Sequence, residues 1–379
     1  MAENTVTLGQ LQQFITLAMA RLGLPDADAA TVGRLMAQAD LQGSDGHGVI
    51  RIPQYARRIL AGGVNTTPTI RVKEERLATA LLDGDNGMGH LVMQRAADLA
   101  IEKARRCGIA WVGSQFSNHA GPASLYARMP LAHDMIGLYF AVGNANHLPP
   151  WGGLDMLLST NPIAAGIPTA DEPPVVLDMA TTVAAYGKVK AKAKRGEMMP
   201  EGWMIDRQGQ PLLDPKRSEE GFLMPIGGYK GYGLSLIVGL LAGTLNGAAM
   251  GKAVIDFNKD DTSMTNTGQA IAVIDPAGGG KDLTGVAIIS YLGGLFFLKH
   301  ARGHEGGADT DQLIEYAKLF RKHGVRSVWV ESNIDIFGKR TGSTIGTLAP
   351  ALAIECAKLK VVLYFSVLAV LSGIRKNHL

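Results

Sequence analysis

The stretch ATALLDGDNGMGHLVMQRAADLAIEKARRCGIAWVGS at residues 78–114 decides the fold class. It opens with a short apolar run at 78–83, and a glycine-rich turn at 84–89 follows. Apolar residues then recur at helical spacing over 91–106, and a second short apolar run covers 109–114. Short apolar runs bounded by turn signals are typical of buried strands, whereas a 3.6-residue spacing indicates an amphipathic helix. The stretch therefore predicts a strand, a helix and a strand, the alternation of a sheet covered by helices.

The same alternation extends to both sides of this stretch. Short apolar runs at 136–142 and 174–177 predict further strands, and the apolar run at 234–245 predicts a helix. Residues 7–42 have the spacing of two helices, and Pro53 is well placed at the first position of a third. The sequence therefore predicts an α/β or α+β body with a helical N-terminal part.

Composition excludes several classes of function. Lys and Arg number 37 and Asp and Glu 34, a formal net charge of +3, which gives no electrostatic case for a nucleic-acid partner. The two cysteines, Cys107 and Cys356, cannot form a disulfide framework or a cysteine metal knuckle, so no metal site is expected. The N-terminus has no signal-peptide pattern, and the apolar run at 361–374 is shorter than the roughly 20 residues of a membrane span. We expect a cytoplasmic protein without a membrane partner.

The sequence also lacks the common catalytic and nucleotide-binding motifs. It contains no G-x-G-x-x-G dinucleotide turn, no Walker A loop, no H-E-x-x-H zinc motif and no G-x-S-x-G nucleophile elbow. Interpretations as a kinase, a zinc protease or a serine hydrolase therefore have no support, and the functional residues must be found from local chemistry.

The first candidate cluster is Gly-His-Gly-Val-Ile-Arg at 46–51. His47 stands between two glycines, where the backbone is closely approachable, and the planar guanidinium of Arg51 suits a carboxylate. One proton donor and one carboxylate clamp are what a site for a 2-oxo acid needs. The alternative is a loop histidine beside a surface arginine, which has the same spacing.

The second candidate cluster is Ser-Asn-His-Ala-Gly at 117–121, just after the predicted strand at 109–114. A histidine in a loop past a strand end is a common catalytic position in α/β proteins. Its near-neutral pKa lets His119 donate a proton to a carbonyl and take it back. The alternative is a capping or core histidine.

Two further segments have features of an anion or ribose site. Asp178, in Leu-Asp-Met-Ala-Thr-Thr at 177–182, could hold a ribose hydroxyl or simply cap a helix. In Gly-Gly-Tyr-Lys-Gly-Tyr-Gly-Leu at 227–234, glycines surround Lys230 just before an apolar helix, so backbone amides and an ammonium could approach an anion. The alternative there is a flexible helix entry. The rigid turn Ser-Thr-Asn-Pro at 159–162 either shapes a pocket or is only a turn.

Together and in this order, these motifs resemble the type 2 malate/L-lactate dehydrogenase family, which includes sulfolactate, ureidoglycolate and 2,3-diketogulonate enzymes and cyclic imine reductases. Pro-Trp-Gly-Gly at 150–153 and Gly-Lys-Val at 187–189 add to the resemblance, which covers about residues 5–270. It implies an α/β (α+β) fold in which a non-Rossmann NAD(P)-binding sheet domain joins a helical N-terminal domain. It also implies a homodimer with a site between subunits.

The resemblance implies a role for individual residues. The family's catalytic acid/base falls on His119, and its substrate site falls on His47 and Arg51. Cofactor contacts fall on four residues of the later motifs: Asp178, Met179, Ala180 and Lys230. Within the same motifs we add Gly228 and Gly231 as cofactor-binding candidates and Asn161 as a substrate-binding candidate.

The activity implied by the resemblance is hydride transfer between a nicotinamide cofactor and a small 2-hydroxy or 2-oxo acid. The cofactor is NAD or NADP, with NAD slightly favoured. The alternatives are a cyclic ketimine reductase of the piperideine-2-carboxylate type and a catalytically silent homologue.

Two features depart from the family pattern. Gly46 stands where the family usually has serine, and the family's late Pro-Gly-Glu cofactor motif is not recognisable in roughly the last hundred residues. We therefore predict a helical N-terminal domain at 1–75, completed by part of the C-terminal segment. A cofactor-binding α/β domain follows at 76–275, and a divergent C-terminal segment at 276–379.

Overall fold

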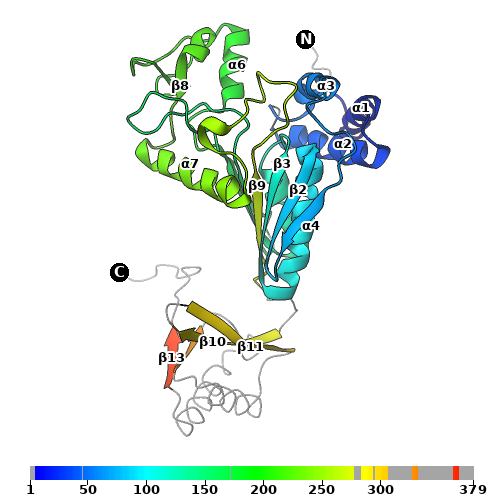
Figure 1. The fold of residues 1–379 in the computed structure, drawn as a ribbon, viewed down its shortest axis with the longest axis vertical. Helices are drawn as coiled ribbons and strands as arrows, with labels where there is room; N and C mark the ends of the chain where they lie inside the picture. Colours follow the sequence, from blue (N-terminus) through cyan, green and yellow to red (C-terminus); the bar gives the residue numbers. More distant parts are fainter. Residues whose placement is uncertain are drawn as a thin grey trace. The chain divides into compact units, whose positions relative to one another are not determined.

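The structure is a computed structural model that describes residues 5–44, 46–170 and 172–276, together with four strands nearer the C-terminus. The chain divides into two compact units, Met1–Pro276 and Ala277–Leu379. All predicted site residues belong to the first unit (Figure 1).

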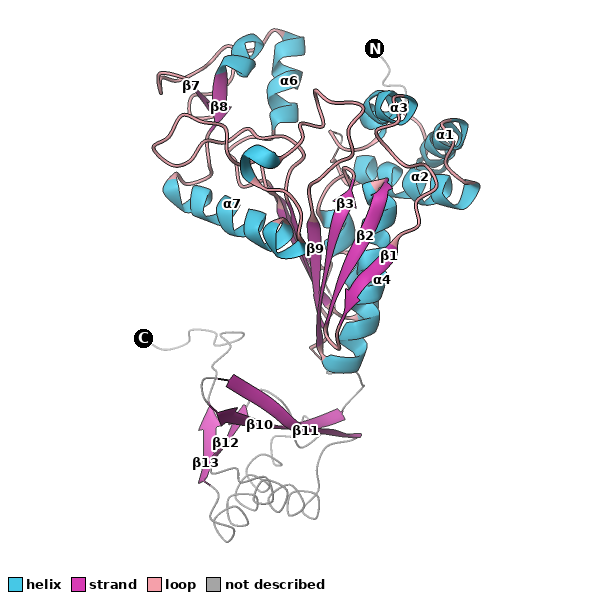
Figure 2. Ribbon diagram, viewed as in Figure 1, coloured by secondary structure: helices cyan, strands magenta, loops and turns pink. Residues whose placement is uncertain are grey.

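A mixed seven-stranded sheet forms the body of the first unit, with the strand order β1-β2-β3-β9-β4-β5-β6 (Figure 2). β2 and β3 pair in parallel, and the other neighbouring strands of this sheet pair antiparallel. The last of these strands in the sequence, β9, lies between β3 and β4 and ties the end of the unit to its middle. The strands are β1 (Arg71–Glu75), β2 (Thr79–Gly87), β3 (Ile109–Ser117), β4 (Ile136–Ala141), β5 (Ile163–Ile167), β6 (Val175–Met179) and β9 (Gln269–Ile274).

Helices cover both faces of this sheet. Successive side chains of a strand point to opposite faces. On β4, Tyr139 belongs to the core cluster that includes Met93 of helix α4, whereas Phe140 packs with Val238 of helix α7. The helices of the unit are α1 (Leu8–Arg21), α2 (Asp26–Leu41), α3 (Ile52–Leu60), α4 (Gly89–Cys107), α5 (Ser124–Ala127), α6 (Tyr186–Arg195) and α7 (Tyr229–Ala242).

The predicted helical N-terminal part is confirmed. α1 begins with a capping box in which Thr7 and Gln10 satisfy each other's backbone N–H groups. Pro53 lies in the first turn of α3, as predicted. The three helices share a core cluster that includes Met19, Met36 and Tyr55. Figure 1 shows α1–α3 beside the end of the sheet where β2 and β3 finish.

Two boundaries differ from the prediction. The glycine-rich segment at 84–89 is not a free turn, because β2 continues through a bulge to Gly87 and α4 begins at Gly89. Asp85 and Asn86 adopt left-handed backbone conformations that absorb the irregularity. The helix predicted at 234–245 begins earlier, at Tyr229, so the second half of the Gly-Lys segment forms its first turns.

The first unit also carries a small two-stranded sheet of β7 (Met204–Asp206) and β8 (Gly221–Leu223), beside α6. In the second unit, β10 (Leu283–Leu292) pairs antiparallel with β11 (Leu295–Glu305), and β12 (Ser327–Glu331) pairs parallel with β13 (Val362–Ser366).

None of the described helices is long and apolar enough to cross a bilayer. Among the described residues, no group of three or more His, Cys, Asp or Glu side chains could hold a metal ion.

Candidate active site

The two predicted histidines meet at the end of the sheet where β3 finishes. His119 lies in the loop directly after β3, and His47 lies in the loop between α2 and a 3-10 turn at Val49–Arg51. The ring of His119 stacks with those of His47 and Phe257, at centroid distances of 5.5 and 5.6 Å. The sequence motifs at 46–51 and 117–121 therefore form one cluster.

A tyrosine fixes the orientation of the His119 ring. The hydroxyl of Tyr55, on α3, lies 2.7 Å from Nδ1 of His119, and the backbone N–H of Gly121 donates to the same nitrogen at 3.3 Å. A phenolic hydroxyl can donate or accept, so Tyr55 can bond to either neutral tautomer of the ring. When Tyr55 accepts from Nδ1–H, Nε2 carries the lone pair that a base needs; when Tyr55 and Gly121 donate to Nδ1, Nε2 carries the proton. This arrangement leaves Nε2 of His119 as the ring nitrogen for a substrate.

Arg51 is held by one edge of its guanidinium. Nε donates to the carbonyl oxygen of Gly46 at 2.7 Å, and Nη1 donates to Oε1 of Gln54 at 2.8 Å. Within the described part of the chain, no hydrogen bond holds Nη2. A guanidinium anchored in this way is pre-positioned for a carboxylate. The backbone of Gly46 supplies the anchor, so the serine hydroxyl that usually stands there is not needed to orient Arg51.

The electrostatics keep His119 neutral. Its burial, and then the charge of Arg51 and the neighbouring His47 and His90, lower the pKa of His119 well below its usual value of 6.5. His90 lies beneath the cluster and is itself fully buried, and burial lowers its pKa to about 3. A neutral imidazole with its proton on Nδ1, where Tyr55 accepts it, can take a second proton at Nε2, so in this tautomer His119 can act as a general base.

A large cavity opens beside this cluster, and we call it the cleft. Its volume is about 1190 Å³, and His47, Arg51 and His119 are among the residues that line it. The cleft also reaches three predicted cofactor residues at the end of β6: Asp178, Met179 and Ala180. Oδ2 of Asp178 accepts the backbone N–H of Ser124 at 2.8 Å, so this side chain caps α5 and borders the cleft at once.

Four predicted residues do not line the cleft. Gly228 and Lys230 lie at the start of α7, where Lys230 is exposed, and Gly231 is buried in its first turn. Asn161 is fully buried, where its amide accepts from Gly143 N–H and donates to the carbonyl of Ser235. Their roles at the cofactor or the substrate stay predictions.

Sequence reasoning missed the role of Tyr55 and Gln54. Gln54 follows Arg51 three residues later and Tyr55 four residues later, a helical spacing that puts both on the same side of one helix. That spacing was the available signal. The involvement of His90 carried no local signal, because α4 brings it under the cluster through tertiary packing.

Replacing Tyr55 by phenylalanine tests the positioning of His119. We expect kcat to fall roughly 10- to 100-fold with a small change in KM, because the ring loses its orienting partner but the carboxylate clamp remains. Steady-state kinetics of Tyr55→Phe measure kcat and KM separately. The control is Tyr232→Phe on α7, a residue outside the cleft lining. An unchanged kcat contradicts the positioning role.

The fold and the site together define a class of protein. A histidine and an arginine share the wall of a cleft large enough for a dinucleotide, on a sheet without a Rossmann turn. The chain belongs to the malate/L-lactate dehydrogenase family, whose family model matches residues 6–286. The family and the fold class inferred from the sequence motifs are thereby confirmed.

Individual relatives agree. A malate dehydrogenase of Pyrococcus abyssi is 40% identical over 72% of this chain and 77% of the relative. The solved sulfolactate dehydrogenase of Methanocaldococcus jannaschii has a TM-score of 0.65 and 33% identity, covering 72% of this chain and 78% of that one. The solved Δ1-piperideine-2-carboxylate reductase of Pseudomonas syringae has a TM-score of 0.68 and 31% identity, covering 73% and 84%.

The C-terminal segment has a different similarity. Residues 274–359 match the model of the ribonuclease H-like domain of the bacteriophage T7 terminase. This match begins in the last residue of β9, and it overlaps the dehydrogenase match over 274–286. The sequence prediction of a divergent C-terminal segment did not anticipate this second family.

Proposed function

We propose that this chain transfers a hydride between a nicotinamide dinucleotide and C2 of a small 2-hydroxy or 2-oxo acid. The observation that carries the proposal is Nε2 of His119, left for a substrate beside the partly engaged guanidinium of Arg51. Arg51 binds the carboxylate, and His119 takes the hydroxyl proton in oxidation and returns it in reduction. His47, stacked on His119, helps to orient the substrate.

The residues present fit a nicotinamide dinucleotide. The cleft exceeds the roughly 300–1,000 Å³ of ordinary ligand pockets, so it has room for a dinucleotide and an acid together. Asp178, Met179 and Ala180 would hold the cofactor, with Asp178 at a ribose hydroxyl. We propose NAD over NADP, because an exposed carboxylate at this position repels a 2′-phosphate.

A panel of substrates with both cofactors tests the proposed function. Pyruvate, oxaloacetate and piperideine-2-carboxylate are offered to the purified full chain with NADH and with NADPH, and the loss of reduced cofactor is followed by absorbance. Turnover of a 2-oxo acid supports the proposal. Turnover of the cyclic imine alone identifies a ketimine reductase instead, and cofactor binding without any turnover identifies a silent homologue.

The pH dependence of oxidation follows from the lowered pKa of His119. The neutral ring is the base, so a lowered pKa means that the ring stays deprotonated, and therefore active, down to a lower pH. We expect the acid limb of kcat/KM for hydroxy-acid oxidation to lie below pH 6.5, the usual histidine value. Arg51→Gln removes a positive charge, so its acid limb moves to higher pH while KM rises. Arg57→Gln, on the following helix α3, makes the same charge change at an exposed position and leaves the limb in place. A wild-type limb above 6.5 contradicts the electrostatics.

We also propose that the protein is a cytoplasmic homodimer. The support for a dimer is α7, whose residues after Gly233 are apolar apart from the buried Ser235, yet which leaves Ile237 more than half exposed. A helix without a polar face is normally covered, and a second copy of the chain would cover it. Sedimentation equilibrium of the full chain, with Ile237→Lys as the interface variant, distinguishes a dimer from a monomer.

A further inference from the structure

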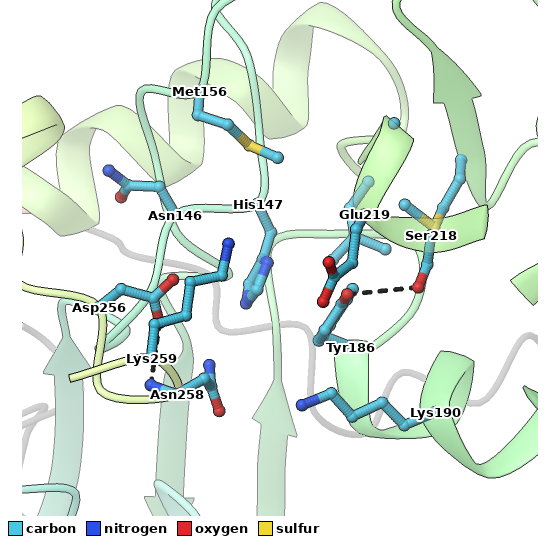
Figure 3. A pocket seen from close by; sticks show the side chains of 13 residues that line it. Asn146, His147, Met156, Tyr186, Lys190, Ser218, Glu219, Asp256, Asn258 and Lys259 are labelled. Atoms are coloured by element: carbon cyan, nitrogen blue, oxygen red, sulfur yellow. Dashed lines mark hydrogen bonds between the residues drawn. The ribbon is translucent and has the colours of Figure 1, made fainter. Parts of the chain in front are cut away.

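A second, smaller pocket adjoins the cleft, and we call it the tail pocket. Its volume is about 130 Å³, and its polar lining includes His147, Tyr186, Lys190, Glu219, Asp256 and Lys259 (Figure 3). His147, Tyr186 and Lys190 also line the cleft, so the two spaces share a wall. One water needs only about 10–15 Å³ of such space, so the tail pocket can take a group of several atoms.

The tail pocket is connected to the carboxylate clamp. Gln54 accepts from Arg51 at 2.8 Å and donates to Oδ1 of Asn258, a residue of both spaces, at 3.2 Å. Lys190 is close enough to Arg51 for the two charges to affect each other. A 2-hydroxy acid with its carboxylate on Arg51 and its C2 hydroxyl on His119 has one part left to place, the substituent on C3. The tail pocket is the neighbouring space for it.

The charges of the tail pocket balance. It contains two ammonium groups, Lys190 and Lys259, and two carboxylates, Glu219 and Asp256. Figure 3 shows Lys259 and Glu219 extending toward the space from opposite sides. Among the described residues none of these four side chains forms an ion pair. His147 adds no charge near neutral pH, because burial lowers its pKa to about 4.

This charge balance determines which class of C3 substituent the tail pocket binds best. A second anionic group would gain from the two lysines but would lie against two carboxylates, and like charges in one pocket are costly. An apolar group would displace water from four charged side chains without replacing its hydrogen bonds. An uncharged group with both N–H donors and a carbonyl acceptor can bond to carboxylates and ammoniums together. The ring of His147, stacked at 4.3 Å on that of Tyr186, offers such a planar group a flat wall.

We propose that the tail pocket binds the C3 substituent of the acid, and that this substituent is an uncharged carboxamide-class group. The inference rests on the proposed function for the position of the acid. It assigns a role in substrate specificity to Glu219, Lys190 and Lys259.

Binding of three matched acids tests this inference without requiring turnover. Malate, its 4-amide and 2-hydroxybutanoate differ only in the group on C3: a carboxylate, a carboxamide or a methyl. Isothermal titration calorimetry of the full chain with saturating NADH, in which a hydroxy acid cannot react, gives a Kd for each. We expect the amide to bind at least about tenfold more tightly than either of the others. Equal affinities for the three acids overturn the proposal.

A pair of neighbouring glutamates supplies the variant and its control. Glu219→Gln removes one carboxylate from the pocket, so we expect the preference to move about tenfold toward malate. Glu220→Gln changes an exposed residue that pairs with Arg217 outside the pocket and should leave the order unchanged. The same effect from both variants overturns the assignment of Glu219. If no 2-oxo acid is turned over but the three acids still bind with the expected ranking of Kd values, the proposed reaction is wrong and the assignment of the tail pocket is retained.

Discussion

Replacing His119 by alanine is expected to lower kcat by roughly 10²- to 10⁴-fold, the range that a general acid–base group contributes. The imidazole is the proton acceptor beside Arg51, and Tyr55 is already bonded to its far nitrogen, so no neighbouring group can take its place without moving. Cofactor affinity should change little, because the predicted cofactor residues lie at the end of β6. Stopped-flow or steady-state kinetics measure the turnover, and NADH fluorescence measures the binding.

The control for this variant is an exposed histidine. His133→Ala removes a ring that contacts Arg105 on the surface and lies outside the cleft, and we expect it to retain wild-type turnover. His119→Ala also leaves the buried hydroxyl of Tyr55 without its partner, at a cost of about 1–3 kcal/mol. Thermal unfolding therefore accompanies the kinetics, so that loss of fold is not mistaken for loss of chemistry. A folded His119→Ala protein with near-normal turnover refutes the acid–base assignment.

The local chemistry of the site could be predicted from the sequence, but its full membership could not. His47, Arg51 and His119 sit in short motifs whose residue types already suggest proton transfer and carboxylate binding, and the structure brings them to one cleft. Phe257 and His90 join the cluster through contacts between residues far apart in the sequence. No local pattern encodes such contacts, because packing of whole elements creates them.

The fold shows the same division. Periodicity predicted the helices of the N-terminal part, and short apolar runs predicted strands at 78–83 and 109–114, which the structure shows as 79–87 and 109–117. The place of β9 between β3 and β4 could not be read in this way, because strand order depends on pairing between distant segments. Likewise Asp178 offered two roles at the sequence level, and only the structure shows that it caps α5 at the margin of the cleft.

Replacing Arg58 by methionine is expected to destabilise the first unit by about 2–4 kcal/mol, the cost of leaving its hydrogen-bond acceptors unpaired. Arg58 is fully buried on α3, and its guanidinium donates to the carbonyl oxygens of Asp260, Gly63 and Ser263. It also lies 4.8 Å from the centre of the Phe257 ring. Methionine has a similar length but no donors, so the carbonyls of Asp260 and Ser263 lose this partner, while that of Gly63 keeps the side-chain amide of Asn86. For a unit of this size the thermal midpoint should fall by roughly 10 °C.

The effect of Arg58 reaches the active site because it fixes the segment that carries Phe257. That ring stacks on His119, so a loosened segment should lower kcat even at temperatures where the variant remains folded. The control is the preceding residue. Arg57→Met removes an exposed arginine whose ion pair with Asp261 spans 3.5 Å, and exposed pairs contribute at most about 1 kcal/mol. If Arg58→Met and Arg57→Met unfold at the same temperature, the buried guanidinium does not hold the segment, and the position of Phe257 against His119 must depend on other contacts.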